Sequence, residues 1–284
     1  MRSVNIVGAG DLGATLAYVL SQREVVRRIG LIDADVGKAK GKALDVAQSG
    51  PVEAFDVAID GFATPEAAPP ADCWLIADPP ELAGPGSDKR IADIARSLAG
   101  LAGSASIVVA ACAQGPALVE ALAPRMQQPD RVVGSAPLAF AAALRRSLAE
   151  ALGITPRAIH AVPMGLPPAN AFVPFGTALA SGIPVERLSA VALRRTLEQL
   201  RSRVLGPVAL AHGAARIAVS LFGERPALLP VFALLSGQYG HRGLALAVPA
   251  RLCRGRVEVI EAALEPVDRV ALDTAADRRR QSQG

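Results

Sequence analysis

The chain has 284 residues, of which 51% are apolar and 4% aromatic, and its formal net charge is +4. This length suits one large domain or two closely packed domains with a substantial core. There is no run of about 18 apolar residues, the length that a membrane-spanning helix needs. The first apolar stretch begins within a few residues of the start, which leaves no room for a signal peptide. We therefore expect no membrane association and a cytoplasmic location.

Cysteine and charge patterns exclude further classes of protein. Cys73, Cys112 and Cys253 are far apart and have no ligand-like spacing, which favours small buried hydrophobic residues over a metal site. The basic residues are mostly arginines that interleave with acids. The run 278–280 is therefore interpreted as a solvated helix end, and the few aromatic residues offer no stacking platform. We expect neither a metal nor a nucleic acid as a ligand.

A glycine-rich turn opens the chain and predicts a nucleotide site. An apolar strand over 4–7 is followed by Gly8, Gly10 and Gly13 in the spacing G-x-G-x-x-G, and an apolar helical pattern continues from there. Gly8 permits the tight turn, Gly10 lets the backbone approach a pyrophosphate, and Gly13 lets the helix pack on the strand. The N–H groups and dipole of the helix N-terminus favour phosphate.

A carboxylate follows at the position that a dinucleotide site uses for the ribose. A second apolar strand ends in Asp33, about 20 residues after the last glycine, where it favours NAD over NADP. The competing interpretation is a glycine turn kept only for packing, in a fold that binds no nucleotide.

Alternating strand and helix patterns fill the rest of the first half. Such alternation predicts βαβ units and a doubly wound parallel sheet, the Rossmann architecture. The expected helices cover 38–47, stopped by 49–51, then 87–98 and a helix from 116; the expected strands cover 57–59, 73–77, 107–111 and 131–133.

The pattern changes after residue 137. The remaining elements predict an α+β domain docked where the parallel strands end, so we expect a dinucleotide-binding domain over 1–136 and a substrate or oligomerisation domain over 137–284. The expected elements are helices over 138–152, 185–204, 208–221 and from 266, strands over 158–162, 228–235, 244–248 and 257–259, and a proline-rich loop over 163–174.

With these elements in place, the chain resembles the lactate/malate dehydrogenase family, and most of all its lactate-dehydrogenase-like malate dehydrogenases. The resemblance spans nearly the whole chain. It implies a Rossmann domain followed by an α+β domain, and NAD as the cofactor. The matching blocks, in family order, are 4–13, 31–33, 41–56, 181–184 and 235–240, with 248–249 after them.

The family's chemistry depends on a few side chains. An imidazole exchanges the hydroxyl proton while hydride moves to the nicotinamide, and a carboxylate holds that imidazole in one tautomer. One arginine grips the substrate carboxylate with two hydrogen bonds, and a second arginine, on a mobile loop, polarises the carbonyl.

The resemblance places other residues at each of these positions. Pro167, in the segment 164–170, stands where the family has its histidine, and a proline carries no titratable group. Phe140 replaces the aspartate, and Ala143 replaces the arginine that grips the substrate. The chain therefore lacks the family's proton carrier and its carboxylate clamp.

The mobile loop and the neighbouring asparagine also differ. Glu81 and Asp88 occupy the positions of the loop arginines, so an anionic substrate would meet repulsion there. Gly115 occupies the position of an asparagine. We expect no ordinary malate or lactate oxidation.

Other residues are weak candidates to replace the lost groups. Arg146 lies one helical turn after the clamp position, so it faces either the old pocket or solvent. His212 begins a helix that borders the family's substrate pocket, and a structural role is the alternative. His160 lies too early in the chain to act as the base, and His241 falls in a turn that we expect to face solvent.

One departure bears on the cofactor. Asp78 stands where the family has a glycine after the fourth strand, and a carboxylate there opposes a pyrophosphate by charge and by size. The glycine fingerprint and Asp33 favour binding, so we expect NAD to bind, more weakly than in the family.

The sequence leaves three functions open. The block 41–56, which forms the main subunit interface in the family, is intact, so a non-catalytic regulatory or assembly protein is expected. Such a protein would associate with itself or with an active relative. The alternatives are an oxidoreductase that recognises a neutral or cationic substrate through Glu81 or Asp88, and a structural protein with a vestigial nucleotide site.

Overall fold

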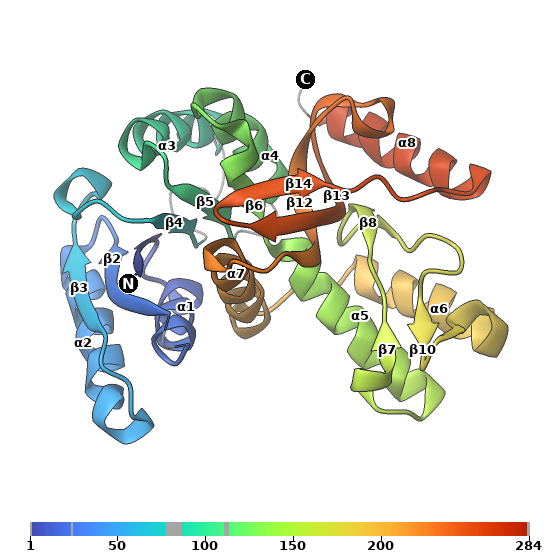
Figure 1. Ribbon diagram of the computed structural model, residues 1–284, viewed down its shortest axis with the longest axis horizontal. Coiled ribbons are helices and arrows are strands. Elements are labelled where there is room, and N and C mark those ends of the chain that lie inside the picture. The colour runs from blue at the N-terminus through green and yellow to red at the C-terminus, as the bar shows by residue number, and fades with distance from the viewer. Residues whose placement is uncertain (1, 24, 78–86, 111–113, 283–284) are drawn as a thin grey trace.

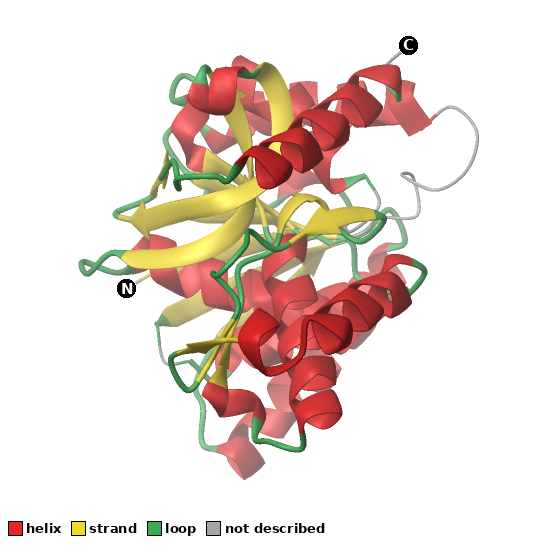
Figure 2. Ribbon diagram, turned by 90° about the vertical axis from the view of Figure 1, so that its right-hand side faces the viewer, coloured by secondary structure: helices red, strands yellow, loops and turns green. Residues whose placement is uncertain are grey.

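The computed structural model describes residues 2–23, 25–77, 87–110 and 114–282, and of residues 87 and 88 it describes the backbone alone. An eleven-stranded mixed sheet forms the centre of the molecule. Helices cover both of its faces, with α3 and α4 on one side and α1, α2 and α7 on the other (Figures 1 and 2).

The first half alternates strands and helices, as predicted. Its elements are β1 (Arg2–Val7), α1 (Asp11–Ser21), β2 (Val26–Ile32), α2 (Val36–Glu53), β3 (Ala58–Phe62), η1 (Pro65–Ala67), β4 (Cys73–Ile76), α3 (Ser87–Ala102), β5 (Ser106–Val109), α4 (Gly115–Leu122), η3 (Ala123–Arg125), η4 (Pro129–Arg131) and β6 (Val132–Gly134).

The six strands β1 to β6 form the parallel half of the sheet. Their order is β3-β2-β1-β4-β5-β6, with parallel pairing throughout, which is the doubly wound arrangement of a dinucleotide-binding domain. β4 and β5 are buried along their whole length, because helices cover both faces of a parallel sheet. The burial of Cys73 raises the pKa of its thiol and confirms the prediction of a small core residue.

Helix α2 departs from its predicted bounds at both ends. It begins earlier because Asp35 caps it, with a carboxylate that accepts a hydrogen bond from the Lys38 N–H at 3.1 Å. The predicted stop at 49–51 is wrong, since Pro51 lies inside the last turns and the helix continues to Glu53, with Ala54 as its cap in the left-handed conformation. Pro51 has no N–H to donate to the carbonyl four residues earlier, so α2 gives up one backbone hydrogen bond there and continues to Glu53.

The second half adds helices and an antiparallel sheet. Its elements are α5 (Ala136–Leu152), η5 (Pro156–Ala158), β7 (Ile159–His160), β8 (Met164–Leu166), β9 (Asn170–Phe172), β10 (Leu179–Ala180), β11 (Ile183–Pro184), α6 (Val185–Arg201), α7 (Pro207–Phe222), β12 (Ala227–Ser236), η6 (Gln238–Gly240), β13 (Arg242–Cys253), β14 (Arg256–Val259) and α8 (Pro266–Gln281).

The central sheet continues from the first half into the second. β12 lies antiparallel to β6, with Phe232 opposite Gly134, and the order runs on through β13, β8 and β9. A Cβ atom on Gly134 would lie 2.8 Å from the Phe232 Cβ, so glycine permits this close pairing. The domain boundary at 136/137 stays a prediction, because this sheet crosses it.

Two predictions about the second half need correction. The proline-rich segment 163–174 contains the hairpin of β8 and β9, because Met164 pairs with Phe172 at the end of the sheet. The run 278–280 is not simply solvated, since Arg279 forms a largely buried ion pair with Glu120 of α4 at 2.5 Å. This pair fastens α8 to the first half of the chain.

Neither a membrane helix nor a metal cluster is found in the part of the chain that the structure describes. Within the described ranges, no helix is both long and apolar enough to cross a bilayer. Over the same ranges, no group of three or more histidine, cysteine or acidic side chains is placed to hold a metal ion.

Candidate nucleotide site

The glycine turn between β1 and α1 has the backbone that its spacing predicts. Gly8 has a positive φ of 102°, and its N–H donates to the Ile32 carbonyl at 2.8 Å, which joins the turn to the end of β2. A Cβ atom on Gly13 would lie 1.8 Å from the Gly8 carbonyl oxygen. The helix therefore packs on the turn at a distance that only glycine allows.

Gly10 differs from these two glycines. Its φ is −74°, which any residue adopts, and a Cβ atom there would meet no atom within 4 Å. Nothing in the described fold requires glycine at this position. The open space beside its backbone is what the approach of a pyrophosphate needs.

Asp33 follows β2 directly and lies against the glycine turn. Its side chain is 5% exposed, and its carboxylate accepts hydrogen bonds from the Ala9 N–H at 2.9 Å, the Asp35 N–H at 3.1 Å and Lys38 Nζ at 3.1 Å. Burial raises the pKa of Asp33, but these hydrogen bonds together with the Lys38 charge outweigh burial and leave the pKa below its ordinary value. The carboxylate is therefore ionised and held in place.

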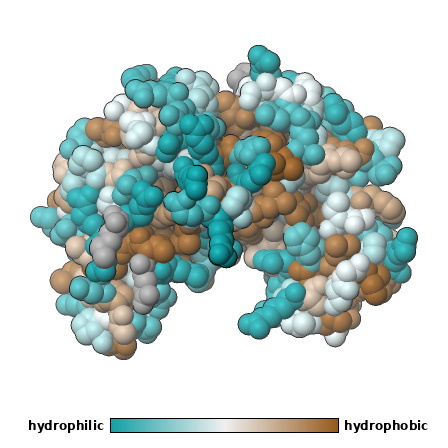
Figure 3. All heavy atoms as spheres, viewed as in Figure 1, coloured by the Kyte–Doolittle hydropathy of each residue, from teal (hydrophilic) through white to brown (hydrophobic). Residues whose placement is uncertain are grey.

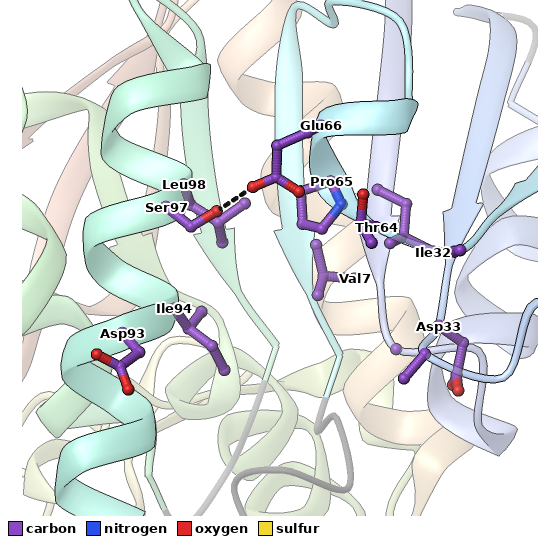
Figure 4. Close-up of a pocket in the computed structure, with 13 residues that line it drawn as sticks. Val7, Ile32, Asp33, Thr64, Pro65, Glu66, Asp93, Ile94, Ser97 and Leu98 are labelled. Atoms are coloured by element: carbon purple, nitrogen blue, oxygen red, sulfur yellow. Dashed lines mark hydrogen bonds between the residues drawn. The ribbon is translucent and has the colours of Figure 1, made fainter.

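A cavity of about 340 Å³ lies at the carboxyl ends of β1 and β2. Val7 and Ile32 form its floor, and Ile94 and Leu98 of α3 close one side (Figure 4). Asp33 stands at one edge, away from the hydrogen bond between Glu66 and Ser97 at 2.7 Å (Figure 4). Apolar walls with an acid at the edge suit an adenine ring and its ribose.

These residues fit a dinucleotide. Gly8, with its positive φ, supplies the turn, and Gly10, with open space beside its backbone, lets a phosphate approach. The buried acid Asp33 supplies an acceptor for the ribose. The predicted conflict with the pyrophosphate rests on Asp78, which lies outside the described residues.

The residues predicted at the family's substrate-binding positions are packing residues in the structure. Phe140 on α5 is 1% exposed and belongs to the hydrophobic core. Ala143, one turn later, packs against the same core. Gly115 opens α4 and faces the Phe232 ring, which a Cβ atom would meet at 3.4 Å. The side chains of Phe140 and Ala143 have no group to bind a carboxylate or to orient an imidazole, and Gly115 has no side chain.

The residue predicted at the position of the family's catalytic histidine also carries no titratable group. Pro167 is buried between β8 and β9. Of the two predicted loop residues, Glu81 lies outside the described residues, and Asp88 belongs to α3, with a side chain outside the described set.

The candidate replacements lie elsewhere. His160 on β7, His212 on α7 and Arg146 on α5 are all exposed, so Arg146 follows the solvated alternative. The prediction that His241 faces solvent is wrong: it is 7% exposed, and its Nε2 lies 2.9 Å from an Asp273 carboxylate oxygen. Helix α8, distant in the sequence, covers the turn that carries it.

Lys38 is a site residue that the sequence reasoning missed. It lies in the first turn of α2, and its ammonium reaches back to Asp33 at 3.1 Å. The sequence could have indicated this role. Lys38 follows Asp33 by five residues, and in a βαβ unit that spacing places it at the start of the next helix. Its pairing with Asp33 depends on the early start of the helix.

Comparison with known proteins gives consistent results. The malate dehydrogenase of Thermomicrobium roseum is 33% identical, over 99% of this chain and 96% of the relative. Among solved structures, the malate dehydrogenase of Salinibacter ruber has a TM-score of 0.89 at 24% identity, over 98% of this chain and 95% of that one. The minor L-lactate dehydrogenase of Enterococcus mundtii has a TM-score of 0.85 at 21% identity, over 99% and 96%. No protein-family model matches the chain.

The parallel sheet, the glycine turn and the acid after β2 define a dinucleotide-binding protein of the Rossmann type. With a 33% identical relative matched over 99% of this chain, the protein belongs to the lactate/malate dehydrogenase family. The predicted fold class is thereby confirmed, and membership in this family supports NAD as the cofactor.

Proposed function

We propose that the protein binds NAD but lacks ordinary 2-hydroxy-acid dehydrogenase activity, and that it has a regulatory or assembly role. The nucleotide part of this proposal rests on Gly8, Gly10, Gly13 and Asp33 as the cofactor-binding residues. Gly10 is the most informative of them, because the fold around it imposes no need for glycine and the space beside it suits a pyrophosphate.

One observation carries the non-catalytic part. Pro167 occupies the base position, and the chain's three histidines are placed elsewhere: two are exposed, and His241 is engaged by Asp273. Loss of a general base alone typically reduces a rate by about 10² to 10⁴. The missing clamp arginine at Ala143 adds to this loss, since a bidentate charge-assisted bond to the substrate is gone.

Two measurements on the purified chain test the proposal. Titration of NADH, followed by its fluorescence and by calorimetry, should give saturable binding. Oxaloacetate and pyruvate should then be reduced at least about 10⁴-fold more slowly than by an active relative such as the Thermomicrobium roseum enzyme under the same conditions. A rate within about tenfold of that enzyme would contradict the proposal.

The two alternative functions, an oxidoreductase with another substrate and a structural protein with a vestigial nucleotide site, each have a separate test. Reduction of a neutral or cationic carbonyl compound in a broad substrate screen would support an oxidoreductase that uses Glu81 or Asp88 for recognition. Absence of any fluorescence or heat change at millimolar NADH would instead favour a vestigial nucleotide site.

Self-association, or association with an active relative, completes the proposal. Apolar side chains are exposed on α2 at Leu44 (58%) and Val52 (83%), and near the start of α7 at Val208 (59%). Such side chains also reach the surface among hydrophilic ones on the face drawn in Figure 3. Light scattering at several concentrations tests this association, and Leu44→Glu should weaken it. A cytoplasmic location stays a prediction.

A further inference from the structure

The ion pair between Asp33 and Lys38 changes the chemistry of the ribose end of the site. Lys38 is 35% exposed and the Asp33 side chain 5% exposed, and their charged atoms lie 3.1 Å apart. The Asp33 carboxylate already accepts hydrogen bonds from two backbone N–H groups besides this ammonium. Much of its capacity to accept bonds from a ribose is therefore in use before any ligand arrives.

Discrimination between NAD and NADP at such a site is electrostatic. A bare carboxylate accepts hydrogen bonds from the 2′-hydroxyl and repels a 2′-phosphate, whereas a nearby cation accommodates that phosphate. Here the ammonium offsets the carboxylate charge at close range. It also has three N–H donors, of which the bond to Asp33 uses one.

Other charged groups nearby do not reverse this balance. The Asp35 carboxylate is exposed and caps α2 through the Lys38 N–H. Glu66 is engaged by Ser97, and Asp93 lies on α3 across the cavity from Asp33 (Figure 4). Lys38 is thus the cation beside the ribose position among the residues that the structure describes.

We propose that Lys38 makes the adenosine end of the site accept a 2′-phosphate, so that the protein binds NADPH about as well as NADH. The inference rests on the proposed nucleotide binding and revises the preference for NAD that Asp33 alone predicts. Lys38 acts as a specificity-determining residue in it, because its ammonium is close enough to move from Asp33 to a phosphate while its stem stays on the first turn of α2.

Calorimetry with four ligands tests the inference: NADH, NADPH, 5′-AMP and adenosine 2′,5′-bisphosphate. The two small ligands probe the ribose end without the nicotinamide. For the natural chain, the NADPH and NADH dissociation constants should agree within about tenfold. Lys38→Met should weaken NADPH and the bisphosphate by at least about tenfold, and change NADH and 5′-AMP by less than about threefold. Lys38→Arg should retain binding of the phosphorylated ligands.

Lys40→Met is the matched control, because Lys40 is exposed on the same helix. It should leave all four constants unchanged, and thermal unfolding checks that each variant is folded. Binding of NADH with NADPH excluded would overturn the inference and leave the proposed function standing. Equal weakening of all four ligands by Lys38→Met would overturn it too, since Lys38 would then only support Asp33. Failure of every ligand to bind would overturn both proposals.

Discussion

The nucleotide end of the sheet and the substrate end differ in how their residues are tied to the fold. At the nucleotide end, the positive φ requires glycine at Gly8, and the close approach of α1 to the Gly8 carbonyl requires glycine at Gly13. Both requirements hold whatever the protein binds. At the substrate end, the resemblance predicts Pro167, Phe140 and Ala143 at the positions of the family's histidine, aspartate and clamp arginine, and in the structure these three are packing residues. A backbone requirement of the fold constrains a residue whatever the protein binds, whereas a side chain that serves only chemistry does not hold the fold together.

This comparison also shows which glycine is informative about a ligand. Gly13 would be needed by a protein that binds nothing, because any side chain collides with the Gly8 carbonyl. Gly10 has no such constraint in the described structure. The two positions thus separate a packing requirement from a binding requirement within one motif.

The largest expected effect comes from introducing an acid at Phe140, the position that the resemblance assigns to the family's aspartate. Phe140→Asp would place a carboxylate in the hydrophobic core at a site that is 1% exposed. We expect a loss of about 3–5 kcal/mol in the free energy of unfolding and no gain in malate oxidation. Urea denaturation and a turnover assay measure the two quantities. A stable, active variant would show that this end is not committed to packing.

Gly13→Ala should have the next largest effect. Its Cβ atom would lie 1.8 Å from the Gly8 carbonyl oxygen, so the helix has to move away from the turn. Overpacking of this kind typically costs about 1–3 kcal/mol, and contact with backbone places this variant at the upper end. Thermal unfolding, with Gly100→Ala on the open side of α3 as a control, measures the change. An unchanged midpoint would contradict the packing role.

Gly10→Val should instead weaken NADH binding and leave the stability of the fold nearly unchanged. The open surroundings of Gly10 predict that the unfolding free energy changes by less than about 1 kcal/mol. The side chain would occupy the space of the pyrophosphate, so NADH binding should weaken at least about tenfold. Denaturation and NADH titration on the same preparation check both parts. Unweakened binding would remove Gly10 from the site.

The smallest effect is a pH dependence at Asp33. Its lowered pKa means that the unfolded chain binds more protons than the folded protein near pH 4. The stabilisation is therefore complete above the ordinary value of about 3.9 and is lost as the pH falls through the lower, folded value. Denaturation of the natural chain and of Asp33→Asn between pH 6 and pH 3 should give curves that converge below about pH 4. A difference that grows with acidity would contradict this.

The sequence predicts the fold well because alternating apolar strands, the glycine turn and Asp33 act locally. It fails where a contact joins distant segments. His241 follows a turn and reads as exposed, yet α8 covers it and supplies Asp273. Lys38 escapes notice because its role depends on where α2 begins, and a cap at Asp35 moves that start by a fraction of a turn. Glu81 and Asp78 lie outside the described residues, so the roles predicted for them stay predictions.

The pairing of Phe232 with Gly134 has a consequence for cleavage of the chain near residue 136. Hydrogen bonds of one sheet cross the point where a sequence-based division would cut the chain. Cleavage there would leave an unpaired strand on each fragment, and bare strand edges recruit other chains into aggregates. The structure therefore does not divide at this point into two separable pieces.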